Sequence, residues 1–122
     1  MVLVADGEER VLQQVSPTLE KAGFTVLTTL GWSATLEFCR DYREPVQLAI
    51  IDIEMGTGSQ EVLRELYQTH PGVRVLFTST GDPPGQVGLS AHFSGFLKKP
   101  FRRSRLLGSV LKAIDAPLPH TA

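Results

Sequence analysis

The sequence predicts an α/β domain, built as a doubly wound, five-stranded parallel sheet with helices on both faces. Apolar runs such as Val2–Ala5 and Leu48–Ile51 are continuous rather than alternating, which is typical of strands buried on both faces of a parallel sheet. Between such runs, apolar residues recur at helical spacing, so strands and helices alternate along the chain. Right-handed connections then bring the carboxyl ends of the strands to one edge of the sheet, where ligands bind.

The composition agrees with one globular domain. The chain has 122 residues, 42% of them hydrophobic, with 12 basic and 13 acidic side chains. This near-neutral balance lacks the excess of positive charge that is typical of proteins that bind nucleic acid or an anionic membrane. No apolar run is long enough to span a bilayer. Cys39 is the only cysteine, which excludes disulfides and indicates a reducing compartment. We expect a cytoplasmic domain over residues 1–115, with no membrane contact, and a flexible tail over residues 116–122.

The first half of the chain predicts three strands and two helices. Val2–Ala5 is the first strand and is followed by a helix that ends at Gly23 and bends at Pro17; its apolar stripe is Val11, Leu12, Val15, Leu19 and Ala22. The β-branched segment Phe24–Thr29 predicts the second strand. The second helix ends before Pro45, and its apolar residues are Leu36, Phe38, Cys39 and Tyr42. The third strand ends at Asp52.

The second half predicts two more strands and two more helices. The third helix stops at His70-Pro71-Gly72, and its apolar stripe is Val62, Leu63, Leu66 and Tyr67. Strands are predicted at Val73–Thr78 and Phe93–Leu97, separated by a segment whose prolines and glycines allow at most a turn or two of helix. The last helix carries Leu106, Leu107, Val110, Leu111 and Ile114 on its apolar face.

Polar side chains follow the predicted strands at their carboxyl ends. Asp6 follows the first strand, Asp52 ends the third, Ser79 and Thr80 follow the fourth, and Lys99 follows the fifth. Two carboxylates, a hydroxyl and an ammonium therefore meet at one edge. Carboxylates are the ligands that Mg²⁺ prefers, and a lysine beside them offsets their charge. A phosphoryl group on Asp52 would need this arrangement, with Mg²⁺, Lys99 and Ser79 each contacting one oxygen.

Four segments, in order and spacing, resemble the receiver domain of response regulators, the phospho-acceptor half of two-component signalling. They are Val2–Asp6, Ile50–Met55, Val75–Ser79 and Gly95–Phe101, and the resemblance extends from residue 2 to about residue 115. It implies a flavodoxin-like receiver fold with a cis peptide bond before Pro100. Among receiver domains, the chain resembles in particular the terminal receiver of a hybrid histidine kinase. The sequence alone does not distinguish a stand-alone regulator from a domain of a larger protein.

The resemblance also implies a role for each site residue. Asp52 is then the phosphorylation site and Lys99 the active-site lysine. Ser79 and Phe96 are then the switch residues, and Mg²⁺ is held by Asp6, by Asp52 and by the backbone carbonyl of Glu54. The implied partner is a histidine kinase or a histidine phosphotransfer protein.

One departure from the family concerns the metal. Members of the family have two adjacent acidic residues after the first strand, whereas this chain has Asp6-Gly7. Gly7 stands where the carboxylate that contacts Mg²⁺ directly is expected, so we expect weak Mg²⁺ binding. Glu8 and Glu54 are the candidates for a substitute ligand.

Two further departures concern loops. Gly56–Ser59 lacks the usual proline and is one residue short, so we expect an altered, looser loop beside Asp52. The segment that matches the fourth helix of the family carries Pro83, Pro84, Gly85 and Gly88, and His92-Phe93 replaces a small pair. Since many receivers pair through that helix, we expect a monomer.

Other notable residues have simpler interpretations. Cys39 is interpreted as a core residue, Lys98 as an exposed lysine, and Trp32 as a partly exposed contact residue. The three histidines, His70, His92 and His120, lack metal-ligand spacing. The basic residues near Lys99 indicate a solvated helix start that could guide an acidic partner.

The leading function is a phosphorylatable switch, not a metabolic enzyme, in which a phosphoryl group passes from a partner phosphohistidine to Asp52. One alternative is a pseudo-receiver, an interaction module with impaired Mg²⁺-dependent phosphorylation, for which Gly7 is the best evidence. A weaker alternative is a small phosphatase, because Asp52-Ile53-Glu54 is similar to the acidic pair of some aspartate-nucleophile hydrolases.

Overall fold

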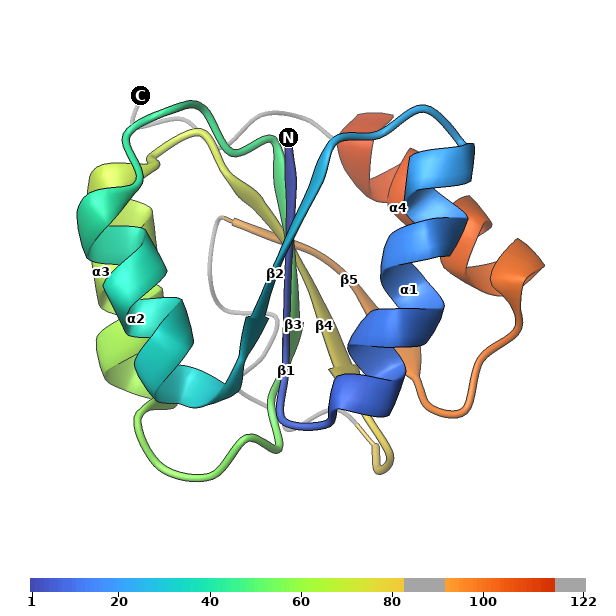
Figure 1. Ribbon diagram of the computed structural model, residues 1–122, viewed down its shortest axis with the longest axis horizontal. Coiled ribbons are helices and arrows are strands. Elements are labelled where there is room, and N and C mark those ends of the chain that lie inside the picture. Colours follow the sequence, from blue (N-terminus) through green and yellow to red (C-terminus); the bar gives the residue numbers. More distant parts are fainter. Residues whose placement is uncertain (83–91, 116–122) are drawn as a thin grey trace.

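The computed structural model describes residues 1–82 and 92–115. Residues 83–91 and 116–122, which hold the predicted short helix and the predicted tail, lie outside the described residues. The described strands form one parallel sheet with the order β2-β1-β3-β4-β5 (Figure 1). They are β1 (Val2–Asp6), β2 (Val26–Leu30), β3 (Leu48–Asp52), β4 (Arg74–Ser79) and β5 (Phe93–Lys98). The predicted five-stranded parallel sheet is confirmed.

Helices cover both faces of this sheet. They are α1 (Glu9–Lys21), α2 (Gly31–Asp41), α3 (Ser59–Thr69) and α4 (Arg103–Asp115). Figure 1 shows α1 and α4 together on one face and α2 and α3 together on the other, which is the doubly wound arrangement. Within residues 1–82 and 92–115, no helix is both long and apolar enough to cross a membrane.

Each central strand contributes side chains to the apolar cores on both faces of the sheet. Val2 and Val4 of β1 belong to the apolar cluster under α1 and α4, whereas Leu3 and Ala5 belong to the cluster under α2 and α3. All five residues of β1 and all five of β3 are buried. Because both faces of these central strands are covered, their sequence shows no polar alternation.

Several predicted strand boundaries shift by one or two residues. The second strand begins at Val26 rather than Phe24, because Phe24 N–H donates to Leu19 O (3.1 Å) and so closes α1. Gly23, just after the C-terminal end of α1, adopts φ +98°, in agreement with the prediction that it ends the helix. α1 continues without a break through Pro17.

The prediction for Trp32 was wrong. Its side chain is buried, with 6% of its surface exposed, and its indole N–H donates to Gly56 O at 3.0 Å. The ring also packs against Gly58, where an added Cβ would lie 3.5 Å from Trp32 Cβ. Trp32 therefore fastens α2 to the loop that follows β3. Cys39 is fully buried, as predicted for a core residue.

Candidate phospho-acceptor site

The predicted site residues lie together at the carboxyl edge of the sheet. Asp6 ends β1, Asp52 ends the neighbouring strand β3, and Lys99 follows β5 directly. Asp6 and Asp52 are both buried, with 2% and 4% of their surfaces exposed. Central strands buried on both faces thus hold two carboxylates at the point where the sheet meets solvent.

Lys99 joins the two carboxylates. Its Nζ lies 2.7 Å from Asp6 Oδ2 and 3.4 Å from Asp52 Oδ2. One ammonium therefore faces two carboxylates, which leaves the ionised cluster one negative charge in excess. Such an excess in a mostly buried cluster attracts a cation.

Backbone N–H groups hold the remaining carboxylate oxygens. Asp52 Oδ1 accepts from Glu54 N–H at 2.9 Å, and Asp52 Oδ2 is 3.4 Å from Gly7 N–H. Asp6 Oδ1 accepts from Glu8 N–H at 2.9 Å. Short turns after β1 and β3 thus fix both carboxylates, because each aspartate binds the N–H two residues further along.

The pKa values at this site reflect burial and pairing. Burial raises the pKa of Asp6 above its ordinary value, and the hydrogen bonds from Lys99 and Glu8 N–H offset only part of this rise. Burial alone would lower the pKa of Lys99, but its hydrogen bond to Asp6 and the charges of Asp6 and Asp52 raise it. Lys99 therefore stays protonated across the neutral range and is available to neutralise an anion.

The chain around Lys99 is tied to β4. Lys99 N–H donates to Ser79 O at 2.7 Å, and the Lys99–Pro100 peptide bond is cis. Ser79 Oγ accepts from Gly81 N–H at 3.0 Å, and its side chain is buried. Phe96 pairs with Phe77 in the β4–β5 register and packs, half-buried, against the core under α2 and α3. Lys98 is exposed, as predicted, and forms an ion pair with Asp82 at 3.3 Å.

The carboxylate of Glu54 is engaged by Thr80, a contact that was not predicted. Glu54 Oε1 accepts from Thr80 N–H at 2.6 Å, and the Thr80 hydroxyl lies 3.0 and 2.9 Å from the two carboxylate oxygens. The Thr80 N–H bond, followed by the hydroxyl, lowers the pKa of Glu54. Since both residues stand at strand ends, only their turn geometry could have revealed the contact.

The donors available to a cation match part of the expected set. Asp6, Asp52 and the Glu54 carbonyl are hard oxygen ligands of the kind that Mg²⁺ takes. Within residues 1–82 and 92–115, no three acidic, histidine or cysteine side chains gather closely enough to form a metal site. Gly7 contributes no side chain, and the Glu54 carboxylate is held by Thr80. The residues present therefore fit a weakly held cation.

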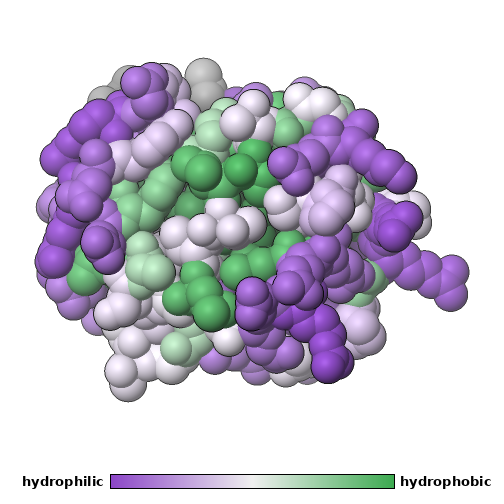
Figure 2. Space-filling view, viewed as in Figure 1, coloured by the Kyte–Doolittle hydropathy of each residue, from purple (hydrophilic) through white to green (hydrophobic). Residues whose placement is uncertain are grey.

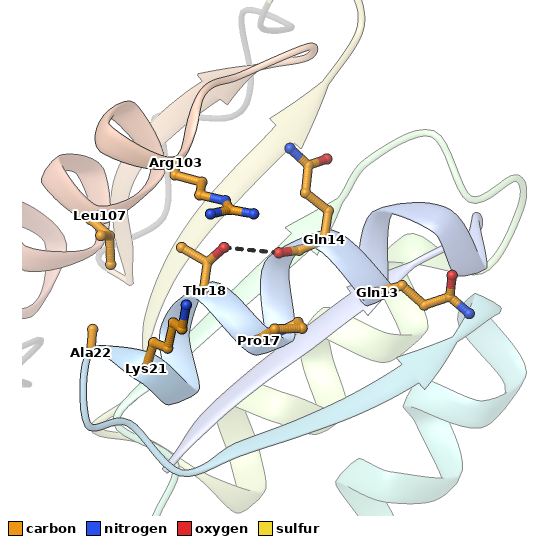
Figure 3. Close-up of a pocket in the computed structure, with 8 residues that line it drawn as sticks. All are labelled: Gln13, Gln14, Pro17, Thr18, Lys21, Ala22, Arg103 and Leu107. Carbon is orange, nitrogen blue, oxygen red and sulfur yellow. Dashed lines mark hydrogen bonds between the residues drawn. The ribbon is translucent and has the colours of Figure 1, made fainter.

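Two hollows lie near these elements. One, of about 220 Å³, lies beside Lys99 and is lined by Glu8, Val11, Gln14, Thr80, Lys99, Pro100 and Phe101. The other, of about 410 Å³, lies between α1 and α4, with Thr18 donating to Gln14 O on its floor (Figure 3). None of the residues that line the second hollow belongs to the carboxylate and lysine cluster. Of these two hollows, only the smaller one is lined by a residue of the cluster, Lys99.

Comparisons with known proteins agree with this geometry. Residues 2–111 match the family model of the response regulator receiver domain. The C4-dicarboxylate transport transcriptional regulatory protein DctD of Pseudomonas aeruginosa is 34% identical over 93% of this chain and 25% of its own length. Sensor kinase CckA of Brucella abortus is 27% identical over 93% of this chain and 12% of its own length. The chain thus spans a quarter or less of these two relatives.

Solved structures extend the likeness to the whole fold. The structure of the chemotaxis response regulator CheY4 of Vibrio cholerae superposes with a TM-score of 0.79 at 26% identity. The superposition covers 92% of this chain and 96% of that chain. The similarity therefore extends over nearly the whole length of both chains.

Proposed function

This chain belongs to the family of response regulator receiver domains, and we propose that its Asp52 accepts a phosphoryl group from a phosphohistidine on a partner protein. The observation that carries this proposal is the position of Asp52 Oδ2. It lies at the solvent edge of the sheet, 3.4 Å from Lys99 Nζ and 3.4 Å from Gly7 N–H. The other oxygen, Oδ1, is occupied by Glu54 N–H.

The transfer forms one bond and breaks one. Asp52 Oδ2 attacks phosphorus, the bond from phosphorus to the imidazole nitrogen of the partner breaks, and the imidazole leaves. The product is an acyl phosphate on Asp52. Lys99, whose pKa is raised, lies where it can neutralise charge on the phosphoryl oxygens during the transfer.

Mg²⁺, which receiver domains typically bind, would supply further positive charge beside those oxygens. Asp6, Asp52 and the Glu54 carbonyl are the residues proposed to hold it, with Glu8 as a candidate substitute ligand. Asp6 already stands within 2.7 Å of Lys99, so this lysine and the cation share one carboxylate.

The acyl phosphate acts as a switch by changing what Ser79 and Phe96 contact. Thr78 of β4 lies opposite Asp52 of β3 in the sheet register, and Ser79 is the next residue of β4. Ser79 is therefore close to the end of the strand that carries Asp52. Phe96 lies on the adjacent edge strand, only partly buried. A phosphoryl group that draws in the Ser79 hydroxyl would break its bond to Gly81 N–H. This is the route by which we propose that phosphorylation reaches the surface.

The partner is a histidine kinase or a histidine phosphotransfer protein, and we place the exchange in the cytoplasm. The relatives include both a transcriptional regulator and a sensor kinase. A stand-alone regulator and a receiver within a longer chain are both compatible with the same transfer chemistry.

A pseudo-receiver is the second candidate, and two observations favour it. Gly7 supplies no carboxylate, and the Glu54 carboxylate is held by Thr80 rather than directed at the cluster. A chain with this site would keep the fold and a constant interaction surface while phosphorylation remained inefficient.

Titration with beryllofluoride and Mg²⁺ separates the two candidates. Beryllofluoride mimics an acyl phosphate on the acceptor aspartate. Trp32 is a suitable fluorescent reporter, because its indole binds the loop that follows Asp52. We expect a saturable fluorescence change that requires both additives and is lost in Asp52→Asn. Asp41→Asn, a change at the exposed end of α2, should leave the response intact.

Absence of any response up to high Mg²⁺ in a folded chain would favour the pseudo-receiver. A response that persists in Asp52→Asn would contradict the assignment of the acceptor.

A further inference from the structure

The edge strand β2 exposes apolar side chains. β2 lies at the end of the sheet, next to β1 alone among the described strands. Leu27 and Leu30 are 39% and 50% exposed, and they are two of the three large apolar side chains that are exposed within the described residues. Natural edge strands are usually protected from pairing by charges, prolines or bulges. β2 contains no charged residue and no proline.

The segment that contains this edge strand carries no charge. No Lys, Arg, Asp or Glu occurs between Lys21 and Glu37. In Figure 2, where β2 lies in front, apolar and near-neutral residues form a band across the middle of the molecule, with hydrophilic residues over the helices on both sides. The segment is also rich in Val, Leu and Thr, and its valine and threonines favour extended structure.

The backbone of β2 has unused pairing capacity. Val2 lies opposite Val26, and Val2 N–H donates to Thr25 O at 2.8 Å. Because alternate residues of a parallel strand bond to the same neighbour, Thr25 and Leu27 face β1, and Val26 and Thr28 direct their N–H and C=O groups out of the sheet. No strand within residues 1–82 and 92–115 pairs with β2 on that side.

We propose that β2 pairs with β2 of a second copy of this chain, antiparallel, about a two-fold axis at Thr28. In this register Thr28 faces Thr28 of the copy and Val26 faces Leu30. The outward backbone groups of Thr28 in the two copies then exchange N–H···O=C bonds. The two sheets become one continuous sheet across the axis.

The side chains of β2 are complementary to themselves in this register. Val26 packs against the core under α1 and α4, and Thr28 lines a shallow hollow together with Leu12, Pro17 and the acidic Glu9 of α1. Leu30 of the copy is therefore placed over an apolar neighbour and loses its exposure. On the other face, Leu27 meets Thr29, whose hydroxyl is already bonded to Thr35 at 2.7 Å.

The self-complementary register and the absence of charge on β2 together favour a second copy as the occupant. Two identical strands repel each other if they carry charge, and like charges directly opposite each other destabilise a strand pair. β2 itself has none, and the formal net charge of the chain is only -1. One pair of five-residue strands is a small contact compared with the roughly 1,200 Å² of a standard interface, so we expect a weak dimer that forms only at high protein concentration.

This inference departs from the monomer expected from the sequence. That expectation concerned residues 83–91 and the surface they would form, whereas β2 is a different edge of the molecule. It is also independent of phosphorylation, so it is tested on the unmodified chain.

Charge changes at position 28 test both the surface and the register. Sedimentation of the unmodified chain from about 10 µM to 1 mM should show a monomer–dimer equilibrium. Thr28→Lys and Thr28→Glu each place like charges face to face across the axis, on an exposed side chain, and should each weaken the dimer at least about fivefold. An equimolar mixture of the two variants should associate again, as a heterodimer.

Leu111→Lys is the matched control. It removes another exposed leucine (54%) and adds the same charge, but on α4 rather than on β2, so it should leave the dimer unchanged. A wild-type chain that stays monomeric at every concentration overturns self-pairing. The alternative occupant of this edge is then a strand of another protein. A dimer unaffected by both Thr28 variants, or a mixture that fails to associate, overturns the proposed register.

Discussion

At Gly7 the site has room for a side chain that the sequence does not provide. A Cβ built there would lie 3.5 Å from Met55 Cγ and 3.8 Å from Asp52 Oδ2, which are ordinary contact distances. The backbone of Gly7 is not in the left-handed region. A side chain can therefore begin at this position, close to Asp52, without a clash at Cβ and without backbone strain.

Gly7→Asp is expected to tighten Mg²⁺ binding by on the order of tenfold, because it adds a hard, charged ligand to the existing carboxylates. Isothermal titration of Mg²⁺ into both proteins measures the effect. Gly7→Asn, of similar shape and without charge, is the control and should give a much smaller gain. An unchanged dissociation constant in Gly7→Asp would mean that Glu8 or Glu54 already supplies the missing ligand.

Sequence reasoning was most successful for residues whose position is fixed by the backbone. Asp6, Asp52 and Lys99 were predicted to meet because the ends of parallel strands share an edge, and they do. Trp32 and the Glu54–Thr80 contact were not predicted. Both depend on side-chain rotamers and on loop shape, and no periodic pattern reports either.

At the scale of elements, Glu54 and Thr80 connect two loops of the site. Glu54 follows β3 and Thr80 follows β4, and Ile53 N–H also donates to Thr78 O at 3.0 Å. The loop beside the acceptor is thus tied to the segment that carries Ser79. These bonds connect β3 and β4 directly at their carboxyl ends.

The Glu54–Thr80 contact should give the chain a measurable dependence of stability on pH. Because Thr80 lowers the pKa of Glu54 below its ordinary 4.5, the stabilisation is fully present above pH 4.5 and is lost as pH falls through the lower, folded value. Glu54→Gln should reduce the free energy of unfolding at pH 7 by less than about 1 kcal/mol, since the pair is exposed.

Urea denaturation of Glu54→Gln and wild type over a series of pH values tests this expectation. The difference between the two proteins should shrink towards zero at acidic pH. Glu37→Gln, which changes an exposed acid of α2, should show neither effect. A difference that is constant with pH would mean that the Glu54 charge contributes nothing to the contact.

The order and type of the described elements followed from the sequence more reliably than their ends did. The type depends on apolar periodicity over many residues, whereas an end depends on a few local hydrogen bonds, such as Phe24 N–H to Leu19 O. Leu111 illustrates the same limit. It was predicted on the apolar face of the last helix but is 54% exposed, because the buried stripe of α4 consists of Leu106, Val110 and Ala113.

For the whole molecule, the fold explains why Asp52 lies beside other polar groups at one edge of the sheet. The sheet is covered on both faces, so the carboxyl edge is where its polar chemistry gathers, and Asp52 lies there between Lys99 and the loops that carry Gly7 and Thr80. The central claim is that Asp52 accepts the phosphoryl group.

Intact-mass spectrometry after incubation with acetyl phosphate and Mg²⁺ tests this claim most directly. The wild-type chain should gain the mass of one phosphoryl group, and the adduct should be absent in Asp52→Asn while it persists in Asp41→Asn. Asp52→Asn keeps the size of the side chain and removes only its charged, nucleophilic oxygen. The same adduct in wild type and in Asp52→Asn would contradict the account.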